Sequence, residues 1–392
     1  MVYSHSSFLD GISDMKLSSI LYIVCALLVL GCSKLRIKDF PLHANPSEEL
    51  YLTSQVTYQR NAFVNEELHP PLVKDWENDY TSLPNRGFTA VDKWLLFGTS
   101  NGYLAVADLN NGRLKGKKNL GDSCPTPPTV YRNILYQTFE VGSSGIIAYD
   151  AQTGDNIWSI DDLHSKSSPI VVDNKVYYQT VNGIIFCLNY LTGDKIWSKI
   201  FPSPIANSAT YIDNLIITAG INGLVMAHEY TSGITVWEKS FNASFMADPV
   251  IHSNQLFLAS HSGDLFILDV HTGNVLYQKS FSIPLYNAPT IDTKHIYIAL
   301  SNGNLVALNR NTYVQKWLFK AVGPIADAPL VTETYIYFAT LAKHLYILNN
   351  QDGELLQDIE LEGRARSTPI IKNGRLLITC ENEKVVTYVA KS

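Results

Sequence analysis

The sequence predicts an all-β fold, an eight-bladed β-propeller of four-stranded blades whose ring is closed by an N-terminal strand completing the last blade. Three observations support this: a strand pattern at a fixed spacing, two turn signals per repeat, and a last repeat that lacks one strand. The recurring strand is apolar, ends in a small residue and appears eight times, forty or forty-one residues apart. Its copies begin at the residue given in parentheses: WLLFGT (94), ILYQTF (134), KVYYQT (175), LIITAG (215), QLFLAS (255), HIYIAL (295), YIYFAT (335) and RLLITC (375).

Two turn signals follow the recurring strand. The first is a glycine, at Gly102, Gly145, Gly183, Gly223, Gly263 and Gly303. The second is a turn followed four residues later by an aromatic residue: Gly154 and Trp158, Gly193 and Trp197, Gly233 and Trp237, Gly273 and Tyr277, Tyr313 and Trp317. Asn-Gly and Thr-Gly suit tight hairpin turns with positive φ, so each repeat holds four short strands, the size of one propeller blade. Because these residues recur from blade to blade whereas a ligand is bound once, we assign them a structural role.

The two ends of the repeat array indicate how the ring closes. After RLLITC the chain supplies one more strand, KVVTYVA, so the last blade lacks its fourth strand and its tryptophan. Forty residues before the first blade's fourth strand, near Gly116, lies Trp76 in LVKDWENDY. We therefore expect the N-terminal segment to supply the missing strand, which removes the open edges of the ring. Deletion of residues 70–80 is predicted to abolish cooperative folding.

Residues 1–31 are predicted to be a lipoprotein signal peptide, with Met15 as the true start. MKLSSILYIVCALLVLGC carries one positive charge and an apolar run, as secretory signals do. Its end resembles a bacterial lipobox, which implies cleavage after Gly31 and diacylation of Cys32. The alternative is a membrane-spanning anchor, but an apolar run of about fifteen residues is short for the ~20 that a spanning helix needs.

Beyond the signal peptide we expect two regions. Residues 32–72, which contain four prolines and four glutamates, are predicted to form a lipidated tether. Residues 73–392 are predicted to form the propeller. Ser33 follows the cysteine, and in the sorting pattern of many Gram-negative lipoproteins a residue other than aspartate at this position implies the outer membrane.

Composition and motif searches limit the possible functions. The formal net charge of −6 argues against nucleic acid, which requires a basic face. Cys124, Cys187 and Cys380 are far apart and form no metal or redox motif, so we expect buried thiols. HExxH and P-loop patterns do not occur. We therefore predict no catalytic residue, no metal site and no bound cofactor.

The repeat resembles that of pyrroloquinoline-quinone-type propellers, as in SNGNLVALNRNTYVQKW (301–317) and VNGIIFCLNYLTGDKIW (181–197). With the lipobox, the tether, eight repeats and a length of 392 residues, the chain is similar to the BamB family of outer-membrane assembly lipoproteins. The resemblance implies a non-enzymatic protein on the periplasmic face of the outer membrane. It also implies a propeller that is monomeric within a hetero-complex. Its partners would be the periplasmic POTRA region of BamA, other assembly lipoproteins and unfolded barrel clients.

In that family the BamA contact lies on loops that join the fourth strand of one blade to the first strand of the next. The matching loops here are FPSPIANSAT (201–210) and FNASFMADPV (241–250). Apolar residues in polar loops suit an exposed interface anchor; the alternative is that they pack down on the blades. The predicted partner-binding residues are Phe201, Ile205, Asn207, Phe245, Met246 and Asp248.

Two other functions stay open. A quinone-dependent dehydrogenase would need unrepeated carboxylates, Ca²⁺ ligands and basic groups at one mouth of the channel, and it would carry the vicinal cysteine pair typical of that class, which this chain lacks. A ligand- or polysaccharide-binding propeller of the cell envelope would use polar residues at the same place. Asp248 and Asp327 are the candidates there for a Ca²⁺ or carbohydrate site.

Overall fold

The computed structural model describes residues 35–38, 40, 57–80, 84, 87–381 and 383–391. The chain divides into two compact units, Met1–Leu35 and Arg36–Ser392, and the second contains every strand of the described residues. The predicted signal peptide and the predicted lipidation site Cys32 lie outside the described residues. Among the residues described, no helix has the length and apolar character needed to cross a bilayer.

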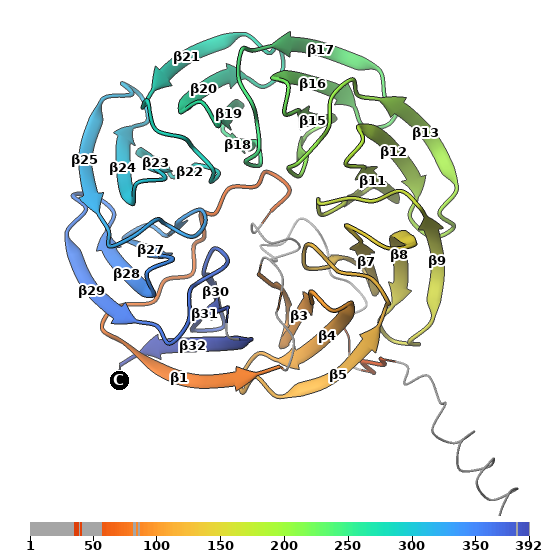
Figure 1. Ribbon diagram of the computed structural model, residues 1–392, viewed down its shortest axis with the longest axis horizontal. Coiled ribbons are helices and arrows are strands. Elements are labelled where there is room, and N and C mark those ends of the chain that lie inside the picture. The colour runs from red at the N-terminus through yellow and green to blue at the C-terminus, as the bar shows by residue number, and fades with distance from the viewer. Residues whose placement is uncertain are drawn as a thin grey trace, which may run out of the picture. The chain divides into compact units, whose positions relative to one another are not determined.

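Eight four-stranded antiparallel sheets stand around a central axis (Figure 1), so the predicted eight-bladed propeller is confirmed. Numbered in chain order, blade 1 contains β2 (Thr89–Val91), β3 (Trp94–Gly98), β4 (Tyr103–Asp108) and β5 (Leu114–Asn119). Blade 2 contains β6 (Thr129–Tyr131), β7 (Ile134–Thr138), β8 (Ser144–Asp150) and β9 (Asn156–Asp161). Blade 3 contains β10 (Ile170–Val172), β11 (Lys175–Gln179), β12 (Ile184–Asn189) and β13 (Lys195–Ile200). Blade 4 contains β14 (Thr210–Ile212), β15 (Leu215–Ala219), β16 (Leu224–Glu229) and β17 (Thr235–Ser240). Blade 5 contains β18 (Val250–His252), β19 (Gln255–Ala259), β20 (Asp264–Asp269) and β21 (Val275–Ser280). Blade 6 contains β22 (Thr290–Ile291), β23 (His295–Ala299), β24 (Asn304–Asn309) and β25 (Gln315–Lys320). Blade 7 contains β26 (Leu330–Val331), β27 (Tyr335–Ala339), β28 (His344–Asn349) and β29 (Leu355–Glu360), and blade 8 contains β30 (Ile370–Lys372), β31 (Arg375–Thr379), β32 (Lys384–Ala390) and β1 (Leu72–Asp79).

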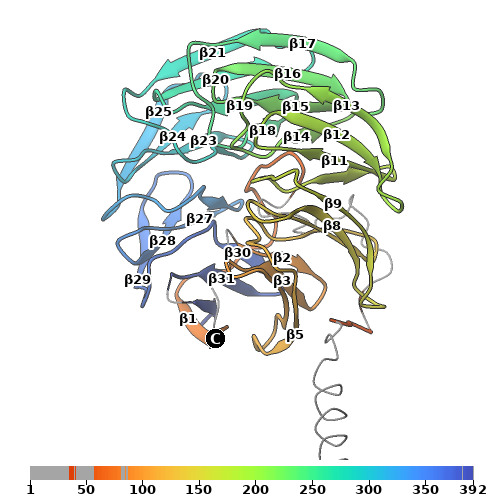
Figure 2. The same ribbon diagram turned by 45° about the vertical axis from the view of Figure 1, so that its right-hand side comes forward.

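In blades 1 to 7 the strands run outward from the axis in chain order (Figures 1 and 2), and in blade 8 the order outward is β30, β31, β32 and β1. The second and third strands are almost wholly buried, as in β19 and β20, because a neighbouring blade covers each face of the sheet. The fourth strand alternates between exposed and half-buried residues, as in β21, because its outer edge has no neighbour. The core therefore consists of layers between blades, which a single blade cannot form alone.

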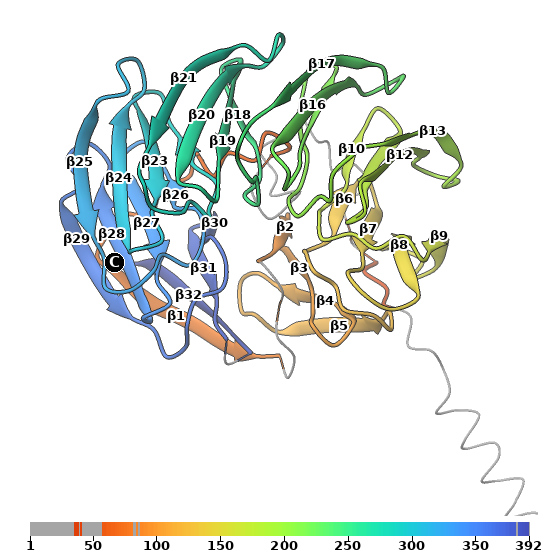
Figure 3. The ribbon, with the colours of Figure 1, turned by 45° about the horizontal axis from the view of Figure 1, so that its top comes forward.

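The predicted closure of the ring by the N-terminal strand is confirmed, and we call the pairing of β1 with β32 the clasp. β1 pairs antiparallel with β32, from Leu72 opposite Ala390 to Asp79 opposite Lys384, and the two strands lie side by side in Figure 3. The ring of Trp76 covers Gly112 of blade 1 so closely that a Cβ there would lie 2.4 Å from it. Asn78 Nδ2 also donates to Asn111 O at 3.0 Å. The strand thus completes blade 8 and contacts blade 1.

The repeated aromatic residues and turn glycines pack against each other across blade boundaries. Trp197 Nε1 donates to Tyr230 O at 3.1 Å, and the Trp197 ring covers Gly233, where a Cβ would lie 2.8 Å from it. The same pairing joins Trp158 to Gly193, Trp237 to Gly273, and Trp317 to Gly353. Where a tyrosine replaces the glycine, a tyrosine also replaces the tryptophan: Tyr277 stacks on Tyr313 with ring centroids 4.1 Å apart.

The region expected to be a tether differs from that expectation, because two parts of it pack on the propeller. We call residues 36–38 and 40 the N-terminal dock; its Ile37 and Phe40 are 3% and 2% exposed. We call residues 57–71 the strap. It runs from the middle of the ring to β1 (Figure 1), and Tyr58, Arg60 and Ala62 within it are buried.

Candidate functional site

The antiparallel blades give the ring two distinct faces. The loop face carries the connections from each fourth strand to the next first strand, together with the turns between second and third strands. Backbone bonds join the two sets: Ile221 N donates to Pro204 O at 3.2 Å, and Leu341 N donates to Pro324 O at 2.9 Å. The turn face carries the remaining turns. The loops 201–210 and 241–250, predicted to bind a partner, lie on the loop face.

Three of the four apolar residues predicted at the interface are buried, so the expectation that they are exposed is wrong. Phe201, Ile205 and Phe245 are 1%, 4% and 0% exposed. The Phe245 ring contacts Phe241 and Phe266 edge-on, with centroids 5.8 and 6.0 Å away. These side chains hold the loops on the blades, so a charge introduced at Ile205 or Phe245 would destabilise the fold.

The repeat itself contained the signal for this burial. An apolar residue occupies the same loop position in five consecutive loops: Ile205, Phe245, Leu285, Ile325 and Ala365, all at most 6% exposed. The next residue has no such constraint and varies: Ala206, Met246, Tyr286, Ala326 and Arg366. Met246, the predicted interface residue at this position, is 46% exposed. A residue type that recurs from blade to blade has a structural role, as for the turn glycines and tryptophans. The repeated position is therefore structural, and the variable position next to it is available for recognition.

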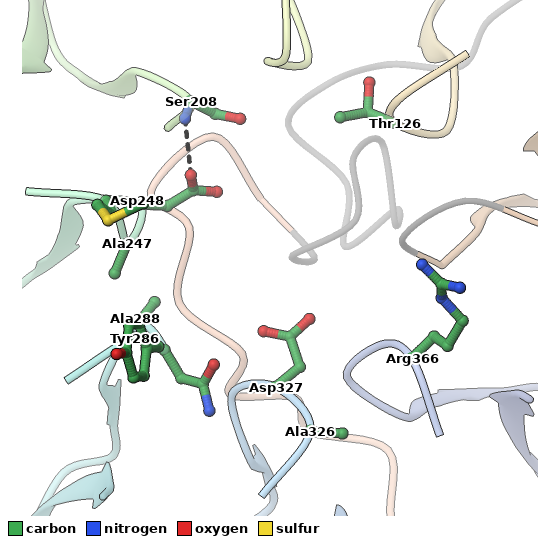
Figure 4. A pocket seen from close by; sticks show the side chains of 11 residues that line it. Thr126, Ser208, Ala247, Asp248, Tyr286, Ala288, Ala326, Asp327 and Arg366 are labelled. Atoms are coloured by element: carbon green, nitrogen blue, oxygen red, sulfur yellow. Dashed lines mark hydrogen bonds between the residues drawn. The ribbon is translucent and has the colours of Figure 1, made fainter. Parts of the chain in front are cut away.

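Asn207 and Asp248 link neighbouring loops instead of projecting outward. Asn207 is 2% exposed, and its Nδ2 donates to Ala219 O and to Phe245 O, each at 3.1 Å. Asp248 Oδ1 accepts a hydrogen bond from Ser208 N at 2.7 Å (Figure 4). Both side chains therefore fix the loops relative to each other.

The strap binds the innermost strands at a forty-residue period. Backbone amides of five consecutive blades donate to its first residues: Val171 to Tyr58 Oη (3.2 Å), Tyr211 to Tyr58 O (2.9 Å), Ile251 to Gln59 O (2.9 Å), Ile291 to Asn61 Oδ1 (2.9 Å) and Val331 to Ala62 O (2.9 Å). An innermost strand has no further strand on its axial side. The strap therefore satisfies main-chain groups that would otherwise need water or a ligand.

A buried guanidinium fixes the strap at the hub. Arg60 is 1% exposed, and its Nε and Nη2 donate to Ala209 O at 3.0 Å and Ser168 O at 3.2 Å. Burial lowers the pKa of Arg60, and the nearby Asp248 carboxylate partly restores it. Asp248 thus faces the strap as well as Ser208, so the structure gives this predicted interface residue an internal role.

Two hollows adjoin on the loop face. The first, of about 220 Å³, is ringed by polar groups from several loops, among them Asp248, Asp327, Arg366 and Thr126 (Figure 4). The second, of about 330 Å³, has Tyr286, Pro324, Ile325 and Leu341 in its walls. Tyr286, Asn287 and Ala326 line both hollows. Among the described residues, no group of three or more His, Cys, Asp or Glu side chains is placed to hold a metal ion.

Four exposed apolar side chains lie on the loop face: Met246 lines the first hollow, Leu341 lines the second, Tyr286 lines both, and Val322 lies in the loop that supplies Pro324 to the second. We call Met246, Tyr286, Val322 and Leu341 the loop-face patch; they are 46%, 50%, 58% and 41% exposed. The His261 ring lies 5.1 Å from the Tyr286 ring and supports it. Only Met246 was predicted from the sequence. Tyr286, Val322 and Leu341 occupy loop and turn positions whose residue type is not kept from repeat to repeat. That lack of repetition in the sequence could have identified them as surface positions.

The three cysteines beyond the N-terminal region are buried thiols, as predicted. Burial raises the pKa of Cys124 to about 12 and the pKa values of Cys187 and Cys380 to about 11. The thiols are therefore protonated and unreactive at neutral pH.

Comparison with known proteins gives one sequence family and several structural neighbours. Residues 73–213 and 221–392 match the family described as outer membrane protein assembly factor BamB. No curated protein matches the chain significantly. The structure of BamB from Moraxella catarrhalis is 19% identical with a TM-score of 0.69, and the match covers 81% of this chain and 99% of that one.

Two other neighbours have the same fold with different origins. A quinohemoprotein alcohol dehydrogenase from Pseudomonas putida is 13% identical with a TM-score of 0.76, covering 90% of this chain and 83% of that one. The computationally designed protein Ika8 is 14% identical with a TM-score of 0.70, covering 81% of this chain and 99% of its own. At these identities the likeness concerns the fold, because the same fold hosts unrelated functions.

Proposed function

This chain belongs to the family of the outer membrane protein assembly factor BamB, and on that premise we propose that it is a non-catalytic scaffold for β-barrel assembly. In this proposal the protein is anchored by a lipid on Cys32 to the periplasmic face of the outer membrane. It binds the POTRA region of BamA and works beside the other assembly lipoproteins. The observation that carries the binding step is the loop-face patch.

The patch has the properties of an interface centre. Met246, Tyr286, Val322 and Leu341 expose apolar surface on loops whose neighbouring residues are packed on the blades. Interfaces depend on a few apolar or aromatic anchors that enter pockets on a rigid partner. The hollow beside Tyr286 and Leu341, of about 330 Å³, has room for an apolar side chain of the partner. The buried residues Ile205 and Phe245 support these loops and belong to the site indirectly.

Unfolded barrel clients are proposed to pair with the outer rim of the ring. Each fourth strand is the last of its sheet, so one backbone edge is available for an incoming strand, a common mode of peptide recognition. On blade 3 the rim also presents Ile196 and Ile200, which are 46% and 76% exposed. Strand pairing with apolar side contacts suits a segment of an unfolded membrane barrel.

A quinone-dependent dehydrogenase is the alternative, and the structural likeness to a quinohemoprotein alcohol dehydrogenase is the observation in its favour. Against it, the strap bonds the innermost strands of five blades and places Arg60 at the hub. A cofactor there would have to displace these contacts. An envelope propeller that binds a polysaccharide would use the polar hollow around Asp248 and Asp327.

Co-purification from outer membranes tests the proposal. Tyr286→Asp and Leu341→Asp introduce charges at exposed positions, so we expect an unchanged melting temperature and about tenfold less BamA recovered with the protein. The matched control is Ile234→Asp, because Ile234 is 64% exposed but lies on the turn face. Undiminished BamA recovery with both patch variants would remove this surface from consideration. A chromophore retained after addition of pyrroloquinoline quinone and Ca²⁺ would support the dehydrogenase instead.

A further inference from the structure

The N-terminal dock attaches the chain to one place on the ring. Ile37 N donates to Ala151 O at 2.8 Å, and Arg36 Nε donates to Thr153 O at 2.6 Å. Gln152 Nε2 donates in return to Phe40 O at 3.0 Å. All three partners lie in the turn between β8 and β9, on the turn face of blade 2. Two buried side chains, Ile37 and Phe40, add apolar contact.

The dock leaves little chain between the ring and the anchor. Cys32 precedes Arg36 by four residues, and four residues span at most about 14 Å when fully extended. A long tether would let the propeller rotate freely beneath the membrane. With the dock in place, a lipid on Cys32 has to enter the bilayer close to blade 2.

We propose that the turn face of blade 2 is the membrane-facing side of the protein, held against the lipid head groups by the dock. This inference rests on the proposed lipid anchor at Cys32. It deepens the proposed function, because it leaves the loop-face patch on the opposite side, directed away from the bilayer and toward the periplasm. The partner at this second surface is the phospholipid surface itself.

The side chains around the dock suit lipid head groups. Arg36 and Lys38 of the dock are exposed. Arg132, in the neighbouring turn of blade 2, lies over the Tyr131 and Tyr190 rings, 5.4 and 5.3 Å from their centroids. Leu191, in the β12–β13 turn of blade 3, which is equivalent to the β8–β9 turn that the dock binds, is 49% exposed. Asp155, in the β8–β9 turn that the dock binds, adds one exposed carboxylate. Cationic, aromatic and apolar side chains together are typical of surfaces that rest at a membrane interface.

Quenching by head-group nitroxide lipids tests the orientation. Full-length, acylated protein is reconstituted into vesicles of phosphatidylethanolamine and phosphatidylglycerol, with a fluorophore on one introduced cysteine. Thr153→Cys marks the turn face of blade 2, and Thr312→Cys marks the same turn position in blade 6, on the opposite side of the ring. Val141→Cys marks the loop face of blade 2. We expect strong quenching at position 153 and weak quenching at 312 and 141. Cys124, Cys187 and Cys380 are buried, and unmodified protein gives the background.

Two further variants separate the dock from the anchor. Replacing Ile37 and Phe40 by serine should keep the protein on the vesicles but equalise the quenching at positions 153 and 312. Cys32→Ser should release the protein from the vesicles altogether. Equal quenching at 153 and 312 in the protein with an intact dock would overturn the proposed orientation and leave the anchor standing. A protein that does not stay on the vesicles before any substitution would overturn both.

Discussion

At the level of single residues, a turn glycine that lies under a tryptophan is required for two separate reasons, its backbone conformation and the aromatic ring above it. Gly233 has a φ of 72°, and a Cβ there would lie 2.8 Å from the Trp197 ring. Gly374 has nearly the same φ, 71°, but nothing lies within 4 Å of the position of its Cβ. The two glycines therefore allow the cost of the conformation to be separated from the cost of the close packing.

Alanine at each position is predicted to destabilise the propeller by different amounts. Gly374→Ala should cost about 1 kcal/mol, because alanine is forced into a left-handed conformation. Gly233→Ala should cost about 1–3 kcal/mol more, since its Cβ also displaces a packed indole. Chemical denaturation of the two variants measures the difference in the free energy of unfolding. Equal losses would mean that the tryptophan moves freely and that its packing does not fix the turn.

The sequence predicted which residues are repeated but not which loop residues are displayed. Ile205 and Phe245 were expected at the surface because an apolar residue in a polar loop suggests an interface, yet both are buried. Burial in a loop depends on the depth to which the loop folds back onto the neighbouring blade, which local composition does not encode. The periodic partners Leu285 and Ile325 do encode it, because a residue that returns every forty positions belongs to the framework.

At the level of elements, the pairing of β1 with β32 is reinforced by four charged side chains: Lys74 and Glu77 of β1, Lys384 of β32, and Glu362 of the loop that follows β29. Lys74 Nζ lies 2.5 Å from Glu77 Oε2 and 3.2 Å from Glu362 Oε1. Lys384 Nζ lies 2.6 Å from Glu362 Oε2 and also pairs with Glu77. Burial raises the pKa of Glu77, but hydrogen bonds from Lys384 and Lys74 outweigh this and hold the pKa below its ordinary value of 4.5. Hydrogen bonds from the same lysines lower the pKa of Glu362.

The clasp is therefore predicted to weaken in acid. A carboxylate whose pKa is lowered by folding stabilises the folded state above its unfolded pKa and loses that effect as the pH falls through the folded value. We expect the melting temperature of the natural protein to fall more steeply below pH 4.5 than that of a Glu77→Gln, Glu362→Gln double variant. The two proteins should differ by a few degrees at neutral pH and converge in strong acid.

Calorimetry across the pH range makes this measurement, with Glu381→Gln as the control. Glu381 lies in the same blade and pairs with Arg364 at the longer distance of 3.9 Å, outside the clasp. Parallel curves for the natural protein and the double variant would show that the clasp does not depend on these charges.

The clasp followed from the sequence, whereas the strap did not, for a physical reason. Counting back one period from a complete blade leads to Trp76, since the missing strand must have the same pattern as its seven equivalents. Residues 57–64 occur once and have no partner elsewhere in the chain. Their backbone groups and the side chains of Tyr58 and Asn61 bind main-chain amides, and a main-chain amide leaves no trace in sequence composition.

At the level of the whole molecule, the ring has two fastenings with different roles. The clasp completes a blade, so a chain without residues 70–80 is expected to lose cooperative unfolding. The strap instead crosses the hub and satisfies one amide in each of five blades, while every blade keeps its four strands. The strap should therefore stabilise the inner edges locally, with the ring remaining intact in its absence.

Hydrogen exchange distinguishes these two roles. Replacing residues 57–64 by glycine and serine keeps the length of the chain but removes Arg60 and the acceptor side chains of Tyr58 and Asn61. We expect exchange to accelerate at five amides spaced forty residues apart: Val171, Tyr211, Ile251, Ile291 and Val331. Val171 and Ile291 lose their side-chain acceptors directly. Tyr211, Ile251 and Val331 lose their main-chain acceptors because the segment no longer docks at the hub without its buried side chains; each bond is worth about 0.5–1.5 kcal/mol. Amides of the β3–β4 ladder in blade 1, such as Leu95 and Phe97, should keep their protection because the strap makes none of the described bonds to that blade. Uniform acceleration across all blades would mean that the hub segment holds the whole ring together, and the division of roles between clasp and strap would then be wrong.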